Sequence, residues 1–167
     1  MSSFEKPFDP RLLQETVGAR GQEASAGFAL AIAIQICAQR KEGPQQVVWV
    51  RQDAARRETG DLYGYGLSMF GLDTNDLLVV HARTFADTLR AGREVVRCPA
   101  VCVVLIETTA PADLTATRRL KLAAEKTGVT PILVRHDDVP VSNAANVRWL
   151  VGAAPQPARN TSGIWPP

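Results

Sequence analysis

The sequence has 167 residues, of which 46% are hydrophobic, 22% are charged and 6% are aromatic. A chain of this length and composition can bury one hydrophobic core, which excludes a disordered or fibrous protein. Nineteen basic and 17 acidic residues leave a net charge of +2, so the chain lacks the concentrated positive charge of a dedicated nucleic-acid binder.

The apolar runs and the cysteines indicate a cytoplasmic protein without a membrane segment. The longest apolar run, residues 28–38, is shorter than the roughly 20 residues that a membrane helix needs. It follows several acidic residues, whereas a secretory signal begins with positive charge. Cys37, Cys98 and Cys102 each lie in an apolar run without metal or redox spacing, so we expect three reduced, buried thiols.

The beginning of the chain predicts a strand, a glycine-containing turn and a helix. Residues 11–17 form the predicted strand, and residues 18–25 form the turn. Ser25 is the expected N-cap of a helix over residues 26–38. Because this helix is apolar on almost every side, we expect it to pack against the centre of a sheet.

Two apolar runs and two helical segments follow. Residues 47–50 and 77–80 are rich in valine and leucine, as expected of strands that are buried on both faces. After an Arg-rich turn, residues 62–70 predict a short helix interrupted by glycines. A longer helix is predicted over residues 84–97, with Thr84 at its start.

The strongest strand signal is the unbroken apolar run of residues 101–106, which we expect at the centre of the sheet. The next helix begins at Asp113 or Thr115 and ends before Gly128. Two more strands are predicted over residues 132–134 and 147–152. Strands that alternate with helices of about 10 to 15 residues predict an α/β fold with a mostly parallel, twisted sheet and helices on both faces.

The turn after the first strand can be compared with the phosphate-binding motif G-x-x-x-x-G-K-[ST]. Gly18 and Ser25 match its first and last positions, but Glu23 replaces the second glycine and Ala24 replaces the lysine. A lysine–phosphate contact contributes about 1.5 to 3 kcal/mol, and the Glu23 carboxylate would repel the phosphate. We therefore expect no bound ATP and no other cofactor. Taken alone, Gly18 and Gly21 also fit an ordinary strand-to-helix turn.

Two carboxylates follow predicted strands, where ATPases hold Mg²⁺ or activate water. Glu107 ends the central strand, although an acidic residue there also serves solubility alone. Asp53 follows the second strand but lies among Arg51 and Arg56, so a solvated, salt-bridged turn is at least as good an interpretation. The vestigial nucleotide site therefore comprises Gly18, Gly21, Glu23, Ala24, Ser25 and Glu107.

The histidines and one basic cluster carry weaker signals. His81 and His136 each follow a strand, but neither has metal-ligand spacing and no Ser/His/Asp arrangement is recognisable, so we expect structural or surface roles. The cluster of Arg118, Arg119 and Lys121 suits phosphate contacts, but a solvated helix face is favoured.

Several segments resemble the RecA core, which is a P-loop NTPase fold. Residues 11–18 (RLLQETVG) resemble the strand that enters the RecA P-loop, and residues 72–78 (LDTNDLL) resemble its approach to the third strand. Within that superfamily, the chain is similar to the ImuA family of translesion-synthesis accessory proteins. The segments that carry this similarity are GFALAIA (27–33), DLTATRRLKLAAE (113–125), GVTPILV (128–134) and NVRWLVGAAP (146–155).

The resemblance implies an organisation and a process. It implies a RecA-like core over residues 11–155, an N-terminal extension over residues 1–10 and a Pro-rich tail over residues 156–167. Family members carry a further helical segment before the first strand, which we expect to be absent or shortened here. The resemblance also implies a RecA relative without a working P-loop that acts in DNA-damage-induced SOS mutagenesis, with an ImuB-like Y-family polymerase relative and an error-prone C-family polymerase.

We therefore expect a non-enzymatic adaptor of mutagenic translesion synthesis. RecA itself is a further expected partner, because RecA protomers pair through the faces beside the nucleotide site. A homo-oligomer is compatible with the sequence. Direct DNA binding is expected to be weak or absent, because residues 136–146 include Asp137 and Asp138 and no lysine or arginine.

Two alternatives stay open at this level. An active ATPase would use Arg20 in place of the missing lysine, with Ser25 on the metal and Glu107 as its outer partner. A DNA-binding module would use Arg118, Arg119 and Lys121.

Overall fold

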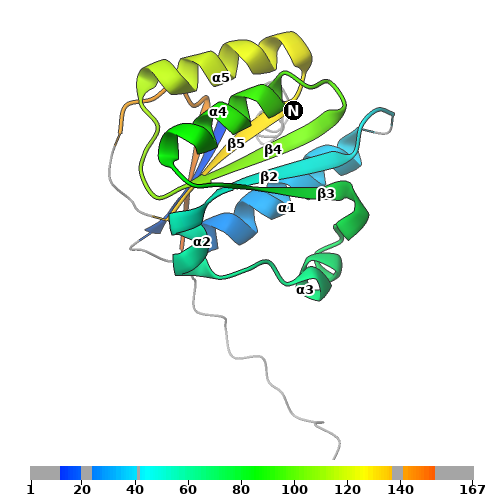
Figure 1. Cartoon of the computed structure of the whole chain (residues 1–167). Helices are drawn as coiled ribbons and strands as arrows, with labels where there is room; N and C mark the ends of the chain where they lie inside the picture. The colour runs from blue at the N-terminus through cyan, green and yellow to red at the C-terminus, as the bar shows by residue number, and fades with distance from the viewer. Residues whose placement is uncertain (1–11, 20–23, 41, 137–140, 153–167) are drawn as a thin grey trace, which may run out of the picture.

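The sheet is parallel throughout and forms the centre of the molecule (Figure 1). The computed structural model describes residues 12–19, 24–40, 42–136 and 141–152. The predicted extension and tail lie outside these residues. Within the described part, six strands follow the order β3-β2-β4-β5-β1-β6, and every neighbouring pair is parallel. The predicted α/β fold with a parallel sheet is confirmed.

Strands and helices alternate along the described chain. The strands are β1 (Gln14–Gly18), β2 (Gln46–Gln52), β3 (Leu77–Ala82), β4 (Val101–Thr108), β5 (Thr130–Arg135) and β6 (Val147–Val151). The helices are α1 (Ala24–Gln39), α2 (Asp53–Thr59), α3 (Gly64–Met69), α4 (Phe85–Val96) and α5 (Leu114–Thr127), and a short 3-10 turn covers Thr74–Asp76. None of the described helices is both long and apolar enough to cross a membrane.

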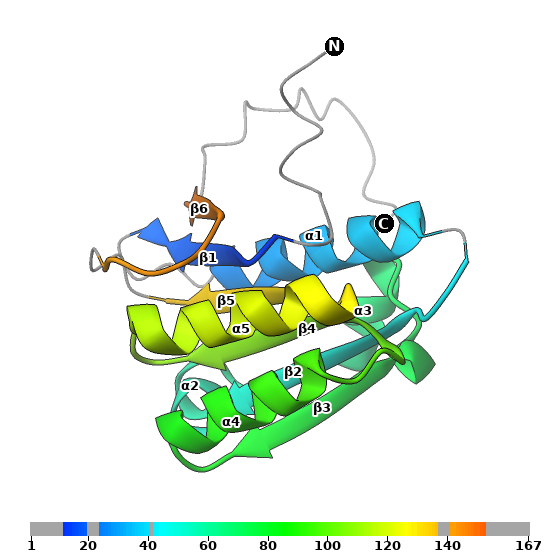
Figure 2. The ribbon, with the colours of Figure 1, turned by 90° about the horizontal axis from the view of Figure 1, so that it is seen from above.

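Helices cover both faces of the sheet (Figure 1, Figure 2). Helix α1 packs on one face, and α4 and α5 lie side by side on the other. Because side chains alternate along a strand, β4 supplies both cores: Leu105 packs on the α1 side, and Ile106 packs on the side of α4 and α5. Burial on both faces explains why β2, β4 and β5 are continuous apolar runs. For β3 the predicted burial on both faces is wrong, because β3 lies at the edge of the sheet, where Leu78 is 53% exposed.

The predicted ends of α4 and α5 are confirmed. The Thr84 hydroxyl accepts a hydrogen bond from the Asp87 amide, and the Asp113 carboxylate accepts one from the Ala116 amide at 2.7 Å. Asp113 is therefore the N-cap of α5, and Thr115 is not. Gly128 ends α5 with φ at 75°, a left-handed conformation that glycine adopts without strain.

One helix of the structure, α2, was not predicted from the sequence. The sequence predicts an Arg-rich turn after the second strand, but α2 forms there. Only Ala55 of α2 is buried, so the segment has no apolar stripe that would reveal a helix. Asp53 in the first turn and two arginines in the last turn complement the helix dipole, which favours the helix locally.

Two further local predictions are wrong. Helix α1 begins at Ala24, so Ser25 lies in its first turn and is not the N-cap. Cys98 is exposed, whereas Cys37 and Cys102 are buried as predicted. The physical reason is that Cys98 lies in the connection between α4 and β4, outside the sheet, although apolar residues flank it in the sequence.

Candidate functional site

Polar side chains gather near the carboxyl ends of β2, β4 and β5. In open α/β sheets this edge is the usual place for a ligand site. Glu107, near the end of β4, is fully buried there. Arg51 of β2 lies next to it in the register of the sheet, and His136 directly follows β5. We refer to these side chains with Ser25, Trp49 and Thr59 as the Glu107 cluster.

Both carboxylate oxygens of Glu107 accept hydrogen bonds. Oε2 accepts from Arg51 Nε at 2.6 Å and from Trp49 Nε1 at 3.0 Å. Oε1 lies 2.9 Å from His136 Nε2 and accepts from Thr59 Oγ1 at 3.4 Å. A buried carboxylate with these donors forms a structural ion pair and has no free oxygen to offer to a metal ion.

The protonation of Glu107 reflects a balance between burial and its donors. Burial by itself raises the pKa of Glu107, because it removes water from the carboxylate. Hydrogen bonds from His136 and Arg51 outweigh burial, so the pKa lies below its ordinary value. Glu107 is therefore ionised at neutral pH, and the buried Arg51 guanidinium balances its charge.

Ser25, His136 and Glu107 form a hydrogen-bonded chain, although no such arrangement is recognisable in the sequence. Ser25 Oγ lies 3.4 Å from His136 Nδ1, and His136 Nε2 lies 2.9 Å from Glu107 Oε1. The residue types are those of a hydrolase triad. However, Ser25 is 0% exposed, and Glu107 is already paired with Arg51. The hydrogen-bonded chain therefore links α1, β4 and the end of β5 inside the protein.

The structure brings part of the predicted vestigial nucleotide site together. Gly18 ends β1, Ser25 lies in the first turn of α1, and Glu107 lies near the end of β4. His136 joins Ser25 to Glu107, so the start of α1 and the end of β4 meet at this edge of the sheet. The other predicted residues lie outside the described part of the chain or have no described side chain: Arg20, Gly21, Glu23 and Ala24.

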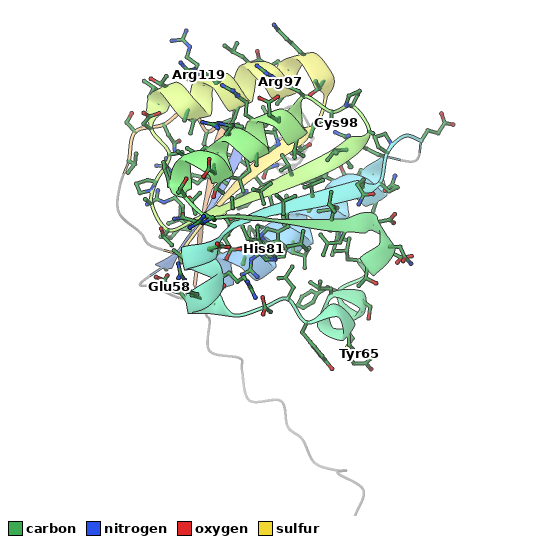
Figure 3. All side chains as sticks on the ribbon, viewed as in Figure 1. Glu58, Tyr65, His81, Arg97, Cys98 and Arg119 are labelled. Carbon is green, nitrogen blue, oxygen red and sulfur yellow. The ribbon has the colours of Figure 1, made fainter. Side chains whose placement is uncertain are left out.

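Asp53 and His81 are separate from the Glu107 cluster. Asp53 begins α2 and forms no ion pair with any described residue. The predicted salt-bridged turn exists only in part, since Arg56 pairs with Asp61 while Arg51 points into the core. His81 is exposed on β3 (Figure 3). No group of three His, Cys, Asp or Glu side chains suited to a metal ion occurs among the described residues.

A second buried carboxylate, Glu15 of β1, lies on the face of the sheet opposite to Glu107. It accepts hydrogen bonds from Arg135 Nη1 at 3.2 Å, Asn143 Nδ2 at 3.0 Å and Arg148 Nε at 2.5 Å. These contacts tie β5, β6 and the segment before β6 to β1. No local pattern reveals them, because the nearest partner is 120 residues away in the sequence.

Helix α3 and its flanks carry an exposed apolar patch with no counterpart among the predicted sites. Tyr63, Tyr65, Met69 and Phe70 have exposed fractions of 61 to 74%, and we call these four residues the α3 patch. Figure 3 shows Tyr65 projecting from this helix. Large apolar side chains exposed together are typical of protein-binding surfaces. Their spacing within eight residues is visible in the sequence, but their exposure is not.

Replacing Glu107 by Gln is expected to reduce the acid sensitivity of the fold. Because the pKa of Glu107 is lowered by folding, its charge stabilises the protein above the ordinary glutamate pKa of about 4.3. That stabilisation is lost as the pH falls through the lower pKa of the folded state. Urea unfolding of both proteins between about pH 6 and pH 3 should show the wild type losing more free energy of unfolding than Glu107→Gln. If the free energy of unfolding changes with pH in the same way in both proteins, the Glu107 carboxylate is not the charge that stabilises the fold.

The parallel six-stranded sheet with helices on both faces defines the class as an α/β protein with a SulA-like fold. The crystal structure of SulA from Pseudomonas aeruginosa matches 73% of this chain and 96% of its own, with a TM-score of 0.54 and 17% identity. Identity at this level bears on the fold alone.

Sequence comparison identifies the family, although no family model matches the chain. Protein ImuA from two strains of Caulobacter vibrioides, NA1000/CB15N and ATCC 19089/CB 15, is 34% identical over 167 residues in each case. The match covers 92% of this chain. The chain belongs to the ImuA family, which confirms the predicted resemblance, and it spans 65% of the length of these relatives.

Proposed function

We propose that this chain is a non-catalytic, cytoplasmic adaptor of DNA-damage-induced mutagenic translesion synthesis. Its proposed partners are an ImuB-like relative of the Y-family polymerases and an error-prone C-family polymerase, with RecA as a further partner. Membership in the ImuA family supports the process. The non-catalytic role is supported by the chemistry of the Glu107 cluster.

The observation that carries the proposal is the state of Glu107. A nucleotide hydrolase needs a carboxylate at this edge of the sheet that is free to act on Mg²⁺. Here, Arg51 and His136 already bind the carboxylate, and Ala24 stands where a phosphate-binding lysine is required. The same side chains that a hydrolase would use for chemistry are engaged in holding three strands and α1 together.

We further propose that the core is a RecA-like P-loop core whose loop has degenerated. Strand β1, the glycine-containing turn and α1 follow one another as in a P-loop, with Gly18 and Ser25 at the matching positions. Glu107 near the end of β4 occupies the position of a Mg²⁺-holding acid. An adaptor also needs surfaces for its partners, and the α3 patch is one suitable surface.

A thermal-shift titration with Mg-ATP and Mg-ADP tests the absence of nucleotide binding. The melting temperature is expected to stay constant at millimolar nucleotide. A ligand at 100 times its Kd would add about 2.7 kcal/mol to the free energy of unfolding, which such a titration detects. A rise in melting temperature that Glu107→Gln abolishes would contradict the proposal and favour an ATPase.

Pull-downs with the purified ImuB-like protein and with RecA test the adaptor role, and capture of neither would contradict it.

A further inference from the structure

A groove lies between α4 and α5. Figure 2 shows these two helices side by side on the face of the sheet opposite to α1. Two adjoining cavities of about 390 and 420 Å³ form the groove, and Arg93 and Arg119 line both of them. The two helices lie side by side on the sheet, so the groove follows their shared length. It is separate from the Glu107 cluster, which lies at the carboxyl edge of the strands.

The floor of the groove is apolar. Leu89 from α4 and Ala116, Leu120 and Ala123 from α5 line it. The two alanines keep the space between the helices open, because larger side chains at these positions would fill it. Leu122 also lines the groove, and 51% of its surface is exposed.

The rim of the groove is basic on both sides. Arg90 and Arg93 of α4 and Arg97, the residue that caps the end of α4, follow one another at intervals of three and four residues and share one helix face. Arg119 and Lys126 lie seven residues apart on α5 and share a face in the same way. Each row spans about 10 Å at 1.5 Å per residue. Figure 3 shows Arg97 and Arg119 on this side of the molecule.

Most of this positive charge has no partner within the described chain. Glu94 lies 3.3 Å from Arg93 and 3.2 Å from Arg97, and it is the only acidic side chain paired with the described rim. No described carboxylate pairs with Arg90, Arg119 or Lys126, the other three residues of the rim. In addition, Arg93 Nε is buried without a hydrogen-bond acceptor. A buried donor without an acceptor is costly, and a bound ligand with acceptor oxygens would remove that cost.

We propose that this groove binds an acidic amphipathic helix of a partner protein. The apolar stripe of such a helix would cover the surface of Leu89 and Leu122, and its carboxylates would face the two basic rows. The arginines would form charge-assisted hydrogen bonds with those carboxylates. The proposal rests on the adaptor role proposed above and assigns it a docking surface and a partner chemistry.

Nucleic acid suits the groove less well. Proteins that bind single strands stack bases on aromatic side chains, and Phe85, which is half-buried, is the only aromatic residue in the lining. Phosphates would use the basic rows but would leave the apolar floor uncovered. Helix-binding grooves, in contrast, combine an apolar floor with a charged rim.

Fluorescence anisotropy with the full chain tests the proposal. The probe is a labelled synthetic peptide of about four helical turns, with leucines at intervals of three and four residues and glutamates beside them. A second peptide carries lysine in place of every glutamate, and a labelled thymidine oligonucleotide represents single-stranded DNA. We expect the acidic peptide to bind, and the lysine peptide to show no binding.

Two double variants with the same change in charge locate the binding. Arg90→Glu with Arg119→Glu reverses the charge of one residue in each row and should weaken binding of the acidic peptide by about tenfold or more. Arg118→Glu with Lys121→Glu changes α5 outside the groove lining and should alter binding by less than about twofold. Leu122→Gln removes apolar surface without changing charge, and should weaken the peptide severalfold.

Three results would overturn the proposal. The first is that the acidic peptide does not bind. The second is that both double variants weaken the binding of the acidic peptide equally. The third is that the oligonucleotide binds, that Arg90→Glu with Arg119→Glu weakens its binding, and that Leu122→Gln does not. The last result would identify a nucleic-acid site. The adaptor role is tested separately: it is contradicted if the wild-type chain captures neither the ImuB-like protein nor RecA. If capture persists in the variant with Arg90→Glu and Arg119→Glu, only the proposed role of the groove is contradicted.

Discussion

Arg51→Met is expected to lower the free energy of unfolding by about 3 to 5 kcal/mol, because it leaves the Glu107 carboxylate buried without its cation. Arg51 is itself only 2% exposed and also donates to Thr59 Oγ1 at 2.7 Å and to the Gly60 carbonyl at 3.0 Å. Its loss therefore also detaches the end of α2 from the sheet. Urea unfolding followed by circular dichroism measures the change.

A double variant and a surface control separate the ion pair from other effects. Adding Glu107→Gln to Arg51→Met removes the stranded charge and should recover part of the lost stability. Arg56→Met is the matched control, since Arg56 pairs with Asp61 at the exposed surface and its loss should not change stability measurably. If Arg51→Met costs no more than Arg56→Met, the Glu107 cluster does not stabilise the fold as we describe.

Gly92→Ala is expected to destabilise the fold, although alanine is the better helix former. A Cβ atom at Gly92 would lie 2.5 Å from Ile106 Cδ1 and 2.8 Å from Ile106 Cγ1, so either the buried Ile106 side chain or α4 would have to shift. Overpacking of this kind costs about 1 to 3 kcal/mol. The gain in helix propensity, about 1 kcal/mol, offsets only part of it. Thermal or urea unfolding of the purified variant measures the net loss.

The Ile106→Ala background reverses the expected sign. Removing the isoleucine side chain opens a cavity, and Gly92→Ala in that background should be neutral or stabilising, because nothing remains for its methyl group to strike. Gly27→Ala on α1 is the control, since Gly27 is exposed and a Cβ there meets no atom within 4 Å. It should stabilise by about 0.5 to 1 kcal/mol. An equal cost of Gly92→Ala with and without Ile106 would exclude the close approach of α4 to β4.

Both predictions concern contacts between elements that are distant in the sequence. Arg51 and Glu107 are 56 residues apart, and the sequence presents the first as part of an Arg-rich turn. Their pairing arises because parallel β2 and β4 are neighbours in the sheet and end at the same edge. The Glu107 cluster is therefore a property of the strand order.

The sequence by itself determined the elements whose signals are local. Continuous apolar runs predicted β2, β4 and β5, because strands covered on both faces contain few polar residues. The run of β3 also predicted a strand, but only the strand order shows that it lies at the edge of the sheet. Asp113 and Gly128 predicted the ends of α5, because capping depends on side chains within one turn of the helix end. The comparison with the phosphate-binding motif also needed only the sequence: Gly18 and Ser25 match its first and last positions, and Ala24 stands at the position of its lysine.

Only the tertiary structure decided what the polar residues do. Glu107 was predicted as the remnant of a metal site, but packing of β2 and β5 beside β4 surrounds it with Arg51 and His136. The same holds for the basic groove. The sequence assigned Arg119 to a solvated helix face, but in the structure it lines the groove together with Arg90 and Arg93 of α4 and with Arg97. Charge and hydrogen bonding act over a few ångströms in space, and sequence separation carries almost no information about such distances.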